Sequence, residues 1–84
     1  NKGEYLKALS NYAQALEILK RTLPSNHPHL ATSYNNIGLV YSKMENYPKA
    51  LSNHTRALEI LKTALPSNHP HLATSYNNIG VVYA

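Results

Sequence analysis

The sequence contains no cysteine. Disulfide bridges, thiolate chemistry and cysteine-ligated zinc are therefore excluded, and nothing suggests a disulfide-stabilised secreted scaffold. No apolar run approaches the ~18 residues of a membrane-spanning helix, and the N-terminal segment lacks the apolar region of a signal peptide. We expect a cytoplasmic (intracellular) protein with no membrane partner. With 84 residues, the chain forms at most one domain.

Groups of residues that support catalysis are also missing. The sequence has no cluster of paired carboxylates, no thiol and no glycine-rich loop. Serine and histidine come close together at Ser25 with His27 and at Ser67 with His69, and no acidic residue is near to orient either imidazole. We therefore expect that the chain is not an enzyme.

Acidic residues are few, and the charges of both signs are confined to two segments. The chain has eight Lys and Arg against four Asp and Glu, a net charge of +4. All twelve lie in Lys2–Arg21 and Lys43–Lys62, and the rest of the chain is neutral apart from histidines. A basic balance raises the alternative of nucleic-acid binding. Because Glu17 and Glu59 interrupt the basic residues, we favour a solvated face over that alternative.

The stretch LPSNHPHLATSYNNIG occurs twice without a change, at Leu23–Gly38 and at Leu65–Gly80. At this offset of 42 residues, 30 of 42 aligned positions are identical. A period between 20 and 50 residues is typical of stacked repeat arrays. The chain starts without Met and stops in mid-pattern at Val82–Ala84, so we expect a piece of a longer array.

Apolar residues recur with helical spacing in four segments. Helices are predicted from Glu4 to about Leu23, from Pro28 to about Met44, from Pro48 to Leu65 and over Pro70–Ala84, because prolines mark most of these boundaries. Asn1–Gly3 is predicted to be the end of a turn. In the first helix, we expect the apolar series to face inward: Tyr5, Ala8, Leu9, Tyr12, Ala15, Leu16, Leu19 and Leu23. The last helix repeats the second, with its apolar face at Leu72, Ala73, Tyr76, Ile79, Gly80 and Tyr83.

Two details of the second helix can be predicted. Either Asn26 or His27 caps it, and Asn is the better capping residue by preference. Gly38 lies inside the helix, where glycine costs about 1 kcal/mol relative to alanine. We expect close helix packing to compensate for this cost. Four helices with short connections make antiparallel helical hairpins.

These segments carry a family signature. Tyr34-x2-Ile37-Gly38-x2-Tyr41, then Ala50-x3-His54 and Pro66, follow the tetratricopeptide pattern, and the chain resembles a tetratricopeptide repeat protein over its whole length. The unit is about eight residues longer than the usual period of about 34. With its L-P-x-x-H-P linker and N-N-I-G, it resembles the kinesin-light-chain type. The resemblance implies an all-α fold of antiparallel helix-turn-helix repeats, stacked as an α-solenoid with a right-handed superhelix.

The resemblance also implies a division of the chain. Residues 1–24 would be an orphan second helix, residues 25–66 a complete repeat, and residues 67–84 an orphan first helix. The outer faces of both terminal helices then lack their sequence neighbours and any polar capping helix. We therefore expect head-to-tail self-association.

In this family the first helices line a concave groove that binds peptides. The resemblance places an asparagine that bonds a peptide backbone at Asn36 and Asn78, and the carboxamide suits that task because it both donates and accepts. No Lys or Arg lies there to grip a terminal carboxylate. The alternative is that one asparagine of each pair bonds a neighbouring helix. The predicted peptide-binding residues are Asn35, Asn36, Leu39, Asn77, Asn78 and Val81.

Two other functions remain open at this point. The chain could be an architectural spacer in a longer array, or a designed or recently duplicated repeat without a ligand. His27 with His29, and His69 with His71, could hold a metal weakly, but no third ligand is near. We expect no cofactor and no metal. His54 is predicted to fill the position of Tyr12 one repeat earlier, where burial would make it sensitive to pH.

Overall fold

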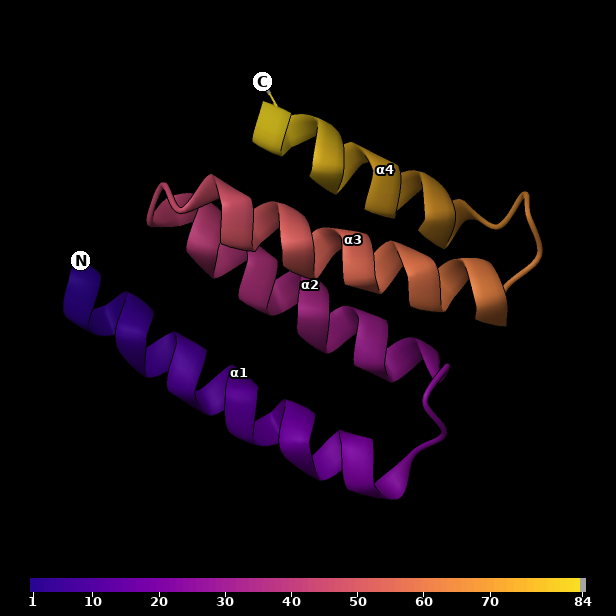
Figure 1. The fold of residues 1–84 in the computed structure, drawn as a ribbon, viewed down its shortest axis with the longest axis horizontal. Coiled ribbons are helices and arrows are strands. Elements are labelled where there is room, and N and C mark those ends of the chain that lie inside the picture. The colour runs from indigo at the N-terminus through magenta and orange to yellow at the C-terminus, as the bar shows by residue number, and fades with distance from the viewer. Residues whose placement is uncertain (84) are drawn as a thin grey trace.

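The computed structural model describes residues 1–83, which form four helices (Figure 1). The helices are α1 (Lys2–Thr22), α2 (Pro28–Lys43), α3 (Tyr47–Ala64) and α4 (Pro70–Tyr83). Short connections join them, and successive helices run in opposite directions. The prediction of an all-α fold with four helices in antiparallel pairs is confirmed. Ala84, the last residue of the predicted fourth helix, lies outside the described residues.

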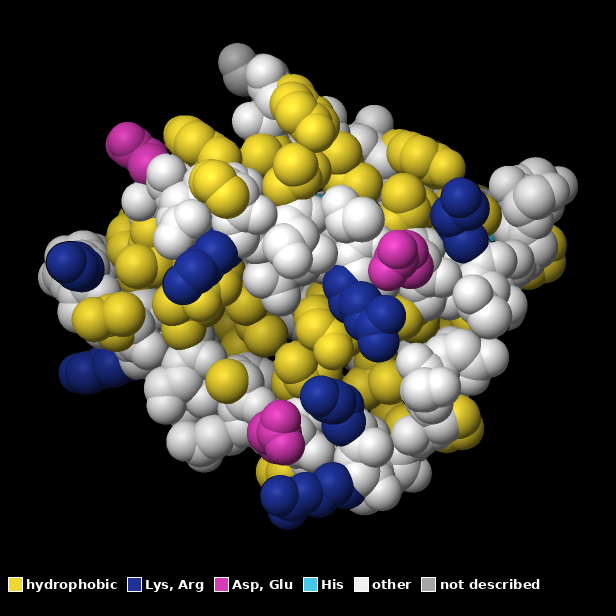
Figure 2. Space-filling model, in the orientation of Figure 1, with side chains coloured by type: hydrophobic (Ala, Val, Ile, Leu, Met, Phe, Trp, Pro, Cys, Tyr) yellow, Lys and Arg dark blue, Asp and Glu magenta, His cyan; other side chains and the backbone are white. Residues whose placement is uncertain are grey.

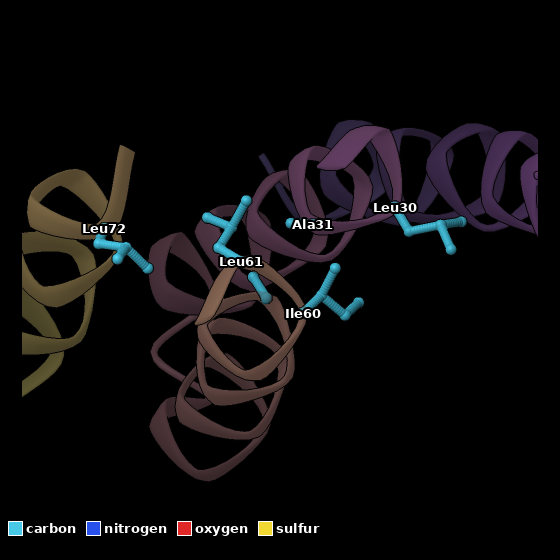
Figure 3. Close-up of a cluster of buried hydrophobic side chains, with 6 residues drawn as sticks. Leu30, Ala31, Ile60, Leu61 and Leu72 are labelled. Atoms are coloured by element: carbon cyan, nitrogen blue, oxygen red, sulfur yellow. The ribbon is translucent and has the colours of Figure 1, made fainter. Parts of the chain in front are cut away.

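The helices α2 and α3 form the most extensive pair, and the other two lie on either side of it. α1 packs on α2, and α4 packs mainly on α3 (Figure 1). The resulting body is flat, with extents of 38 × 33 × 16 Å. Its central apolar cluster comes from α2, α3 and α4 (Figure 3), namely Leu30, Ala31, Ala57, Ile60, Leu61 and Leu72. Burial of such side chains is the main stabilising term, so the fold depends on the α2–α3 pair.

The ends of the helices follow from local chemistry. Leu23 and Leu65 are extended, with ψ of 153° and 155°, because each precedes a proline. The prediction that Asn1–Gly3 ends a turn is wrong. α1 already begins at Lys2, because the Asn1 side chain accepts a hydrogen bond of 3.1 Å from the Glu4 backbone N–H.

The cap of α2 is His27, so the preference for Asn26 is also wrong. His27 Nδ1 accepts the backbone N–H of His29 at 3.1 Å, and His69 does the same for His71 at 3.1 Å. Proline at residue 28 has no N–H, so the first free donor of the helix belongs to His29. The side chain two residues before that donor reaches it, which explains the choice of His27.

A left-handed residue joins α2 to α3. Glu45 has φ of 62°, the only positive φ at a non-glycine residue among residues 1–83. The Asn46 N–H donates to the Tyr41 carbonyl at 2.9 Å, and the Glu45 N–H donates to the Ser42 carbonyl at 3.0 Å. These two bonds form a Schellman motif, in which glycine is the preferred residue at the left-handed position.

Equivalent helices differ in how much of their apolar face is covered. Ile60 in α3 is 5% exposed, whereas the equivalent Ile18 in α1 is 61% exposed. The expectation that Tyr12 and Ala15 face inward is wrong, because within residues 1–83 the helix α1 packs against α2 alone and both side chains are exposed. Part of the apolar face predicted for α4 is likewise exposed, although the equivalent residues of α2 are buried or half-buried. The exposed residues are Ala73, Tyr76, Gly80 and Tyr83.

Glu45→Gly should stabilise the fold. Glycine adopts positive φ without the steric cost of a Cβ, so we expect the free energy of unfolding to rise by about 1 kcal/mol. Urea denaturation at low protein concentration measures the change. Glu45→Ala is the control, since it removes the carboxylate and keeps the Cβ. An equal gain in both variants would show that charge, and not backbone conformation, limits stability at this turn.

Candidate functional site

A hollow of about 530 Å³ lies between α2 and α4. Its wall on one side comes from α2 and on the other from α4, and Leu61 of α3 contributes between them. None of the lining residues is Lys, Arg, Asp or Glu. The lining residues are Pro28, His29, Ala31, Thr32, Asn35, Asn36, Leu61, His71, Thr74 and Asn78.

Three of the six predicted site residues line this hollow. Asn35, Asn36 and Asn78 lie half-buried on its walls. Leu39 and Val81 are exposed and lie outside it. Each follows an asparagine of the hollow by three residues, which places it on the same helix face about one turn further on.

Asn77 is exposed and does not line the hollow, although it occupies the position of Asn35 one repeat later. Asn35 lies in α2, and the following helix, α3, packs against α2. The equivalent side of α4 has no following helix among the described residues. The difference between Asn35 and Asn77 therefore comes from their neighbours, since the local sequence is the same.

Sequence reasoning missed the two histidines of the hollow. His29, Thr32 and Asn36 are spaced i, i+3 and i+7, and so are His71, Thr74 and Asn78. Residues with this spacing lie on one helix face. The same triad occurs in both walls. Its helical spacing and its duplication are the sequence signal from which the place of His29 and His71 in the lining could have been predicted.

Asn35 also ties α2 to α3. His54 Nδ1 lies 2.8 Å from Asn35 Oδ1, and because a carboxamide oxygen can only accept, the imidazole N–H donates. The sequence left open that one asparagine of each pair bonds a neighbouring helix, and Asn35 makes such a bond. Asn36 and Asn78 face the hollow without this bond, and their carboxamides are the better placed for a ligand.

His54 is buried, with 3% of its surface exposed, and burial lowers its pKa below the ordinary value of 6.5. The ring fills the space beside Gly38, where a Cβ would lie 2.9 Å from Cε1 and from Nε2. The burial predicted for His54 is confirmed, whereas the equivalent Tyr12 is exposed. A protonated ring would carry a charge into this contact between α2 and α3, with only the Asn35 carboxamide as an established partner.

The chain should lose stability as the pH falls. Because the folded pKa of His54 is lowered, the unfolded chain takes up a proton first, near pH 6.5. Above pH 6.5, His54 is neutral in both states and costs no stability. As the pH falls from 6.5 toward the folded pKa, the free energy of unfolding decreases. Urea midpoints measured between about pH 7.5 and pH 5 test this expectation.

His54→Tyr should flatten that dependence, since Tyr12 is the equivalent residue of the first repeat. His71→Gln is the matched control at an exposed histidine and should keep the wild-type slope. A slope that is unchanged in His54→Tyr would assign the acid sensitivity to another group.

The histidine pairs of the linkers have structural roles. The rings of His27 and His29 lie 4.7 Å apart between centroids, and His27 Nδ1 already accepts a backbone N–H. Across residues 1–83, no group of three or more His, Cys, Asp or Glu side chains is placed to hold a metal ion.

None of the helices in residues 1–83 is both long enough and apolar enough to cross a membrane.

The family model described as tetratricopeptide repeat matches residues 1–63, which cover α1, α2 and nearly all of α3. The chain belongs to the tetratricopeptide repeat family. None of the curated proteins matches the chain. Tetratricopeptide repeats are in general protein–protein interaction modules and are typically not catalytic, and no enzyme family matches. Family membership therefore implies protein partners in general.

The charges of this tetratricopeptide chain lie away from the hollow. Most lie on α1 and α3, where Figure 2 shows basic side chains spread over one face with acidic ones among them. Arg56 and Glu59 form an exposed pair at 3.8 Å on α3. Exposed pairs of this kind contribute little to stability, so this face is well described as solvated.

Proposed function

We propose that the chain binds a peptide segment of a partner protein in the hollow between α2 and α4. One observation carries this proposal. The helices α2 and α4 supply the same His, Thr and Asn triad to opposite walls of one hollow, whose lining contains no Lys, Arg, Asp or Glu. Such an arrangement presents donors and acceptors to both sides of an extended chain. Leu61 and Ala31, which also line the hollow, are apolar and almost fully buried.

The wall chemistry selects the kind of peptide. A carboxamide can match both the N–H and the C=O of a peptide backbone, whatever the side chains. The lining has no Lys or Arg to neutralise a terminal carboxylate. An internal segment with uncharged polar or small apolar side chains suits the hollow best, bound extended or as a helix. Leu39 and Val81, exposed beyond the hollow, supply apolar contact to a longer segment.

We also propose that the repeat is of the kinesin-light-chain type. The unit of 42 residues, the linker Leu65–Pro70 and the segment Asn77–Gly80 support this assignment. In that division, residues 25–66 are a complete repeat, residues 1–24 a second helix and residues 67–84 a first helix. A cytoplasmic location stays a prediction from the sequence.

The main rival is an architectural spacer with no ligand. Identical walls give the hollow few features with which to select one partner, and this favours the rival. Nucleic acid is a weaker rival, because all basic residues except Lys43 lie on α1 and α3 among acidic ones and none lines the hollow. The third rival is a designed or recently duplicated repeat without a partner.

Asn36→Ala and Asn78→Ala should weaken peptide binding. Peptides are first selected from a random displayed library with the wild-type chain, and their affinities are then measured by fluorescence anisotropy at low protein concentration. Each lost hydrogen bond is worth about 1 kcal/mol, so we expect the double variant to bind about tenfold or more weakly. Thermal melting should stay unchanged, since both side chains are half-exposed.

Asn26→Ala and Asn68→Ala are matched controls, because they remove equivalent asparagines from the exposed linkers. Lost stability with unchanged peptide affinity in the Asn36 and Asn78 variants would favour the spacer. Binding to RNA or DNA with a steep dependence on salt, and not to peptides, would favour the nucleic-acid rival.

A second partner is another copy of the chain. α1 and α4 each carry an apolar face that no described residue covers, and these faces lie at opposite edges of the body (Figure 1). We propose that copies associate head to tail through these two faces.

A further inference from the structure

The exposed face of α1 is the face that α3 buries. Position by position, Ala8, Tyr12, Ala15 and Ile18 correspond to Ala50, His54, Ala57 and Ile60. All four residues of α3 are buried, and they pack mainly against α2. In α1, Ala8 is half-buried and the other three are exposed. α1 therefore presents a surface that fits an α2-like helix, and only Tyr12 differs from its counterpart.

The exposed face of α4 is, in turn, the face that α2 presents to α3. Gly38 in α2 lies so close to α3 that a Cβ there would meet the His54 ring at 2.9 Å and the Ala50 carbonyl oxygen at 3.1 Å. At the equivalent Gly80, a Cβ would meet nothing within 4 Å. Tyr76 and Tyr83 beside it are 55% and 73% exposed. α4 thus keeps the glycine of a tight helix contact without the helix that it would contact.

We infer that α4 of one copy packs against α1 of a second copy with the geometry that α2 and α3 have within one chain, and that this junction creates a second peptide hollow. This inference rests on the proposed self-association and on the proposed peptide site, and it specifies the contact and its consequence. None of the residues compared above is Lys, Arg, Asp or Glu. Lys7 borders the α1 face, as its equivalent Lys49 lies over the Tyr41 ring at 5.4 Å from the centroid. Because the two faces differ and lie at opposite edges, the contact is heterologous and leaves one free face of each kind on a pair of copies.

The second hollow follows from the repeat offset of 42 residues. One wall would come from α4, with His71, Thr74 and the pair Asn77 and Asn78. Asn77 takes the place that Asn35 has in the first hollow. The second copy would supply the other parts, with Leu19 in place of Leu61 and with His29, Thr32 and Asn36 as the opposite wall.

In this arrangement, Asn77 would line the second hollow. In one chain, Asn77 is exposed and outside the hollow. At the junction it would lie beside Tyr12 of the second copy, as Asn35 lies beside His54. A phenol hydroxyl both donates and accepts, so a polar contact is retained there. Successive copies would align their hollows, and a long peptide that spans several of them would favour association.

Two variants test the junction, one on each face. Gly80→Leu fills the space required for Tyr12 of the second copy, and it leaves the monomer intact because nothing lies within 4 Å of the new Cβ. Ile18→Glu places a charge on the exposed α1 face. Analytical ultracentrifugation up to about 1 mM should show a rising mean mass for the wild type and a monomer for each variant. Ala13→Glu, elsewhere on α1 at a position whose equivalent Thr55 is also exposed, should associate like the wild type.

Mixing the two variants is the sharpest measurement. Ile18→Glu keeps an intact α4 face and Gly80→Leu keeps an intact α1 face, so an equimolar mixture should give a heterodimer that grows no further. The inference is overturned if the wild type remains a monomer, if either variant associates alone like the wild type, or if the mixture fails to pair.

Asn77→Ala in the Ile18→Glu copy tests the second hollow. A peptide selected against the wild type, long enough to span two hollows, should bind the heterodimer about fivefold more weakly with this change, and the Ile18→Glu monomer should bind it equally with or without the change. Pairing without any effect of Asn77→Ala would overturn the second hollow. If wild-type chains associate but bind no peptide, the peptide site fails while the junction stands. If monomeric variants bind peptide and the mixture does not pair, the junction fails alone.

Discussion

Gly38 of α2 lies directly against α3, and the rest of the structure depends on this contact. A Cβ at residue 38 would come within 2.9 Å of the His54 ring and within 3.1 Å of the Ala50 carbonyl oxygen. Only glycine allows the two helices to approach so closely, and the cost of glycine inside a helix, about 1 kcal/mol, is offset by the packing it permits. The approach also buries His54 beside Asn35, so one short distance sets both the main apolar contact and the polar bond between the helices.

The duplication separates what local sequence determines from what neighbours determine. Gly38 and Gly80 stand in the same sixteen-residue stretch, and one is buried while the other is exposed. The helices α1 and α3 show the same contrast, since α3 has five buried residues and α1 has none. Each repeat therefore specifies its helices by itself but completes its core only with an adjacent repeat. In a longer array, the next repeat of the same chain would cover these faces in place of a second copy.

Much of the fold could be predicted because its signals are local. The prolines at residues 24, 28, 66 and 70 set one end of each of the four helices to within a residue or two, and the apolar spacing indicated that these segments are helical. The caps were less predictable. Asn26 has the stronger intrinsic preference, but the missing N–H of Pro28 makes His27 the residue in register with the first free donor.

Which residues line the hollow could be predicted only in part, for a reason that the two asparagine pairs show. Asn36 and Asn78 line the hollow because their position on the helix face fixes their direction. Asn35 and Asn77 have identical local sequence, and yet one bonds His54 and the other is exposed. Which asparagine bonds a neighbour depends on whether a neighbouring helix exists, and a single repeat does not encode that.

The same dependence explains how a hollow with few distinctive features could still act selectively. Each wall offers an identical set of imidazole, hydroxyl and carboxamide groups without formal charge at neutral pH, so one hollow distinguishes peptides poorly. In the proposed association, aligned hollows would add their contacts along one bound chain, and the gain would grow with the number of hollows that a peptide can span. Selectivity in such an array lies in the length and regular spacing of the partner segment, because these are the properties that a repeated weak contact can measure.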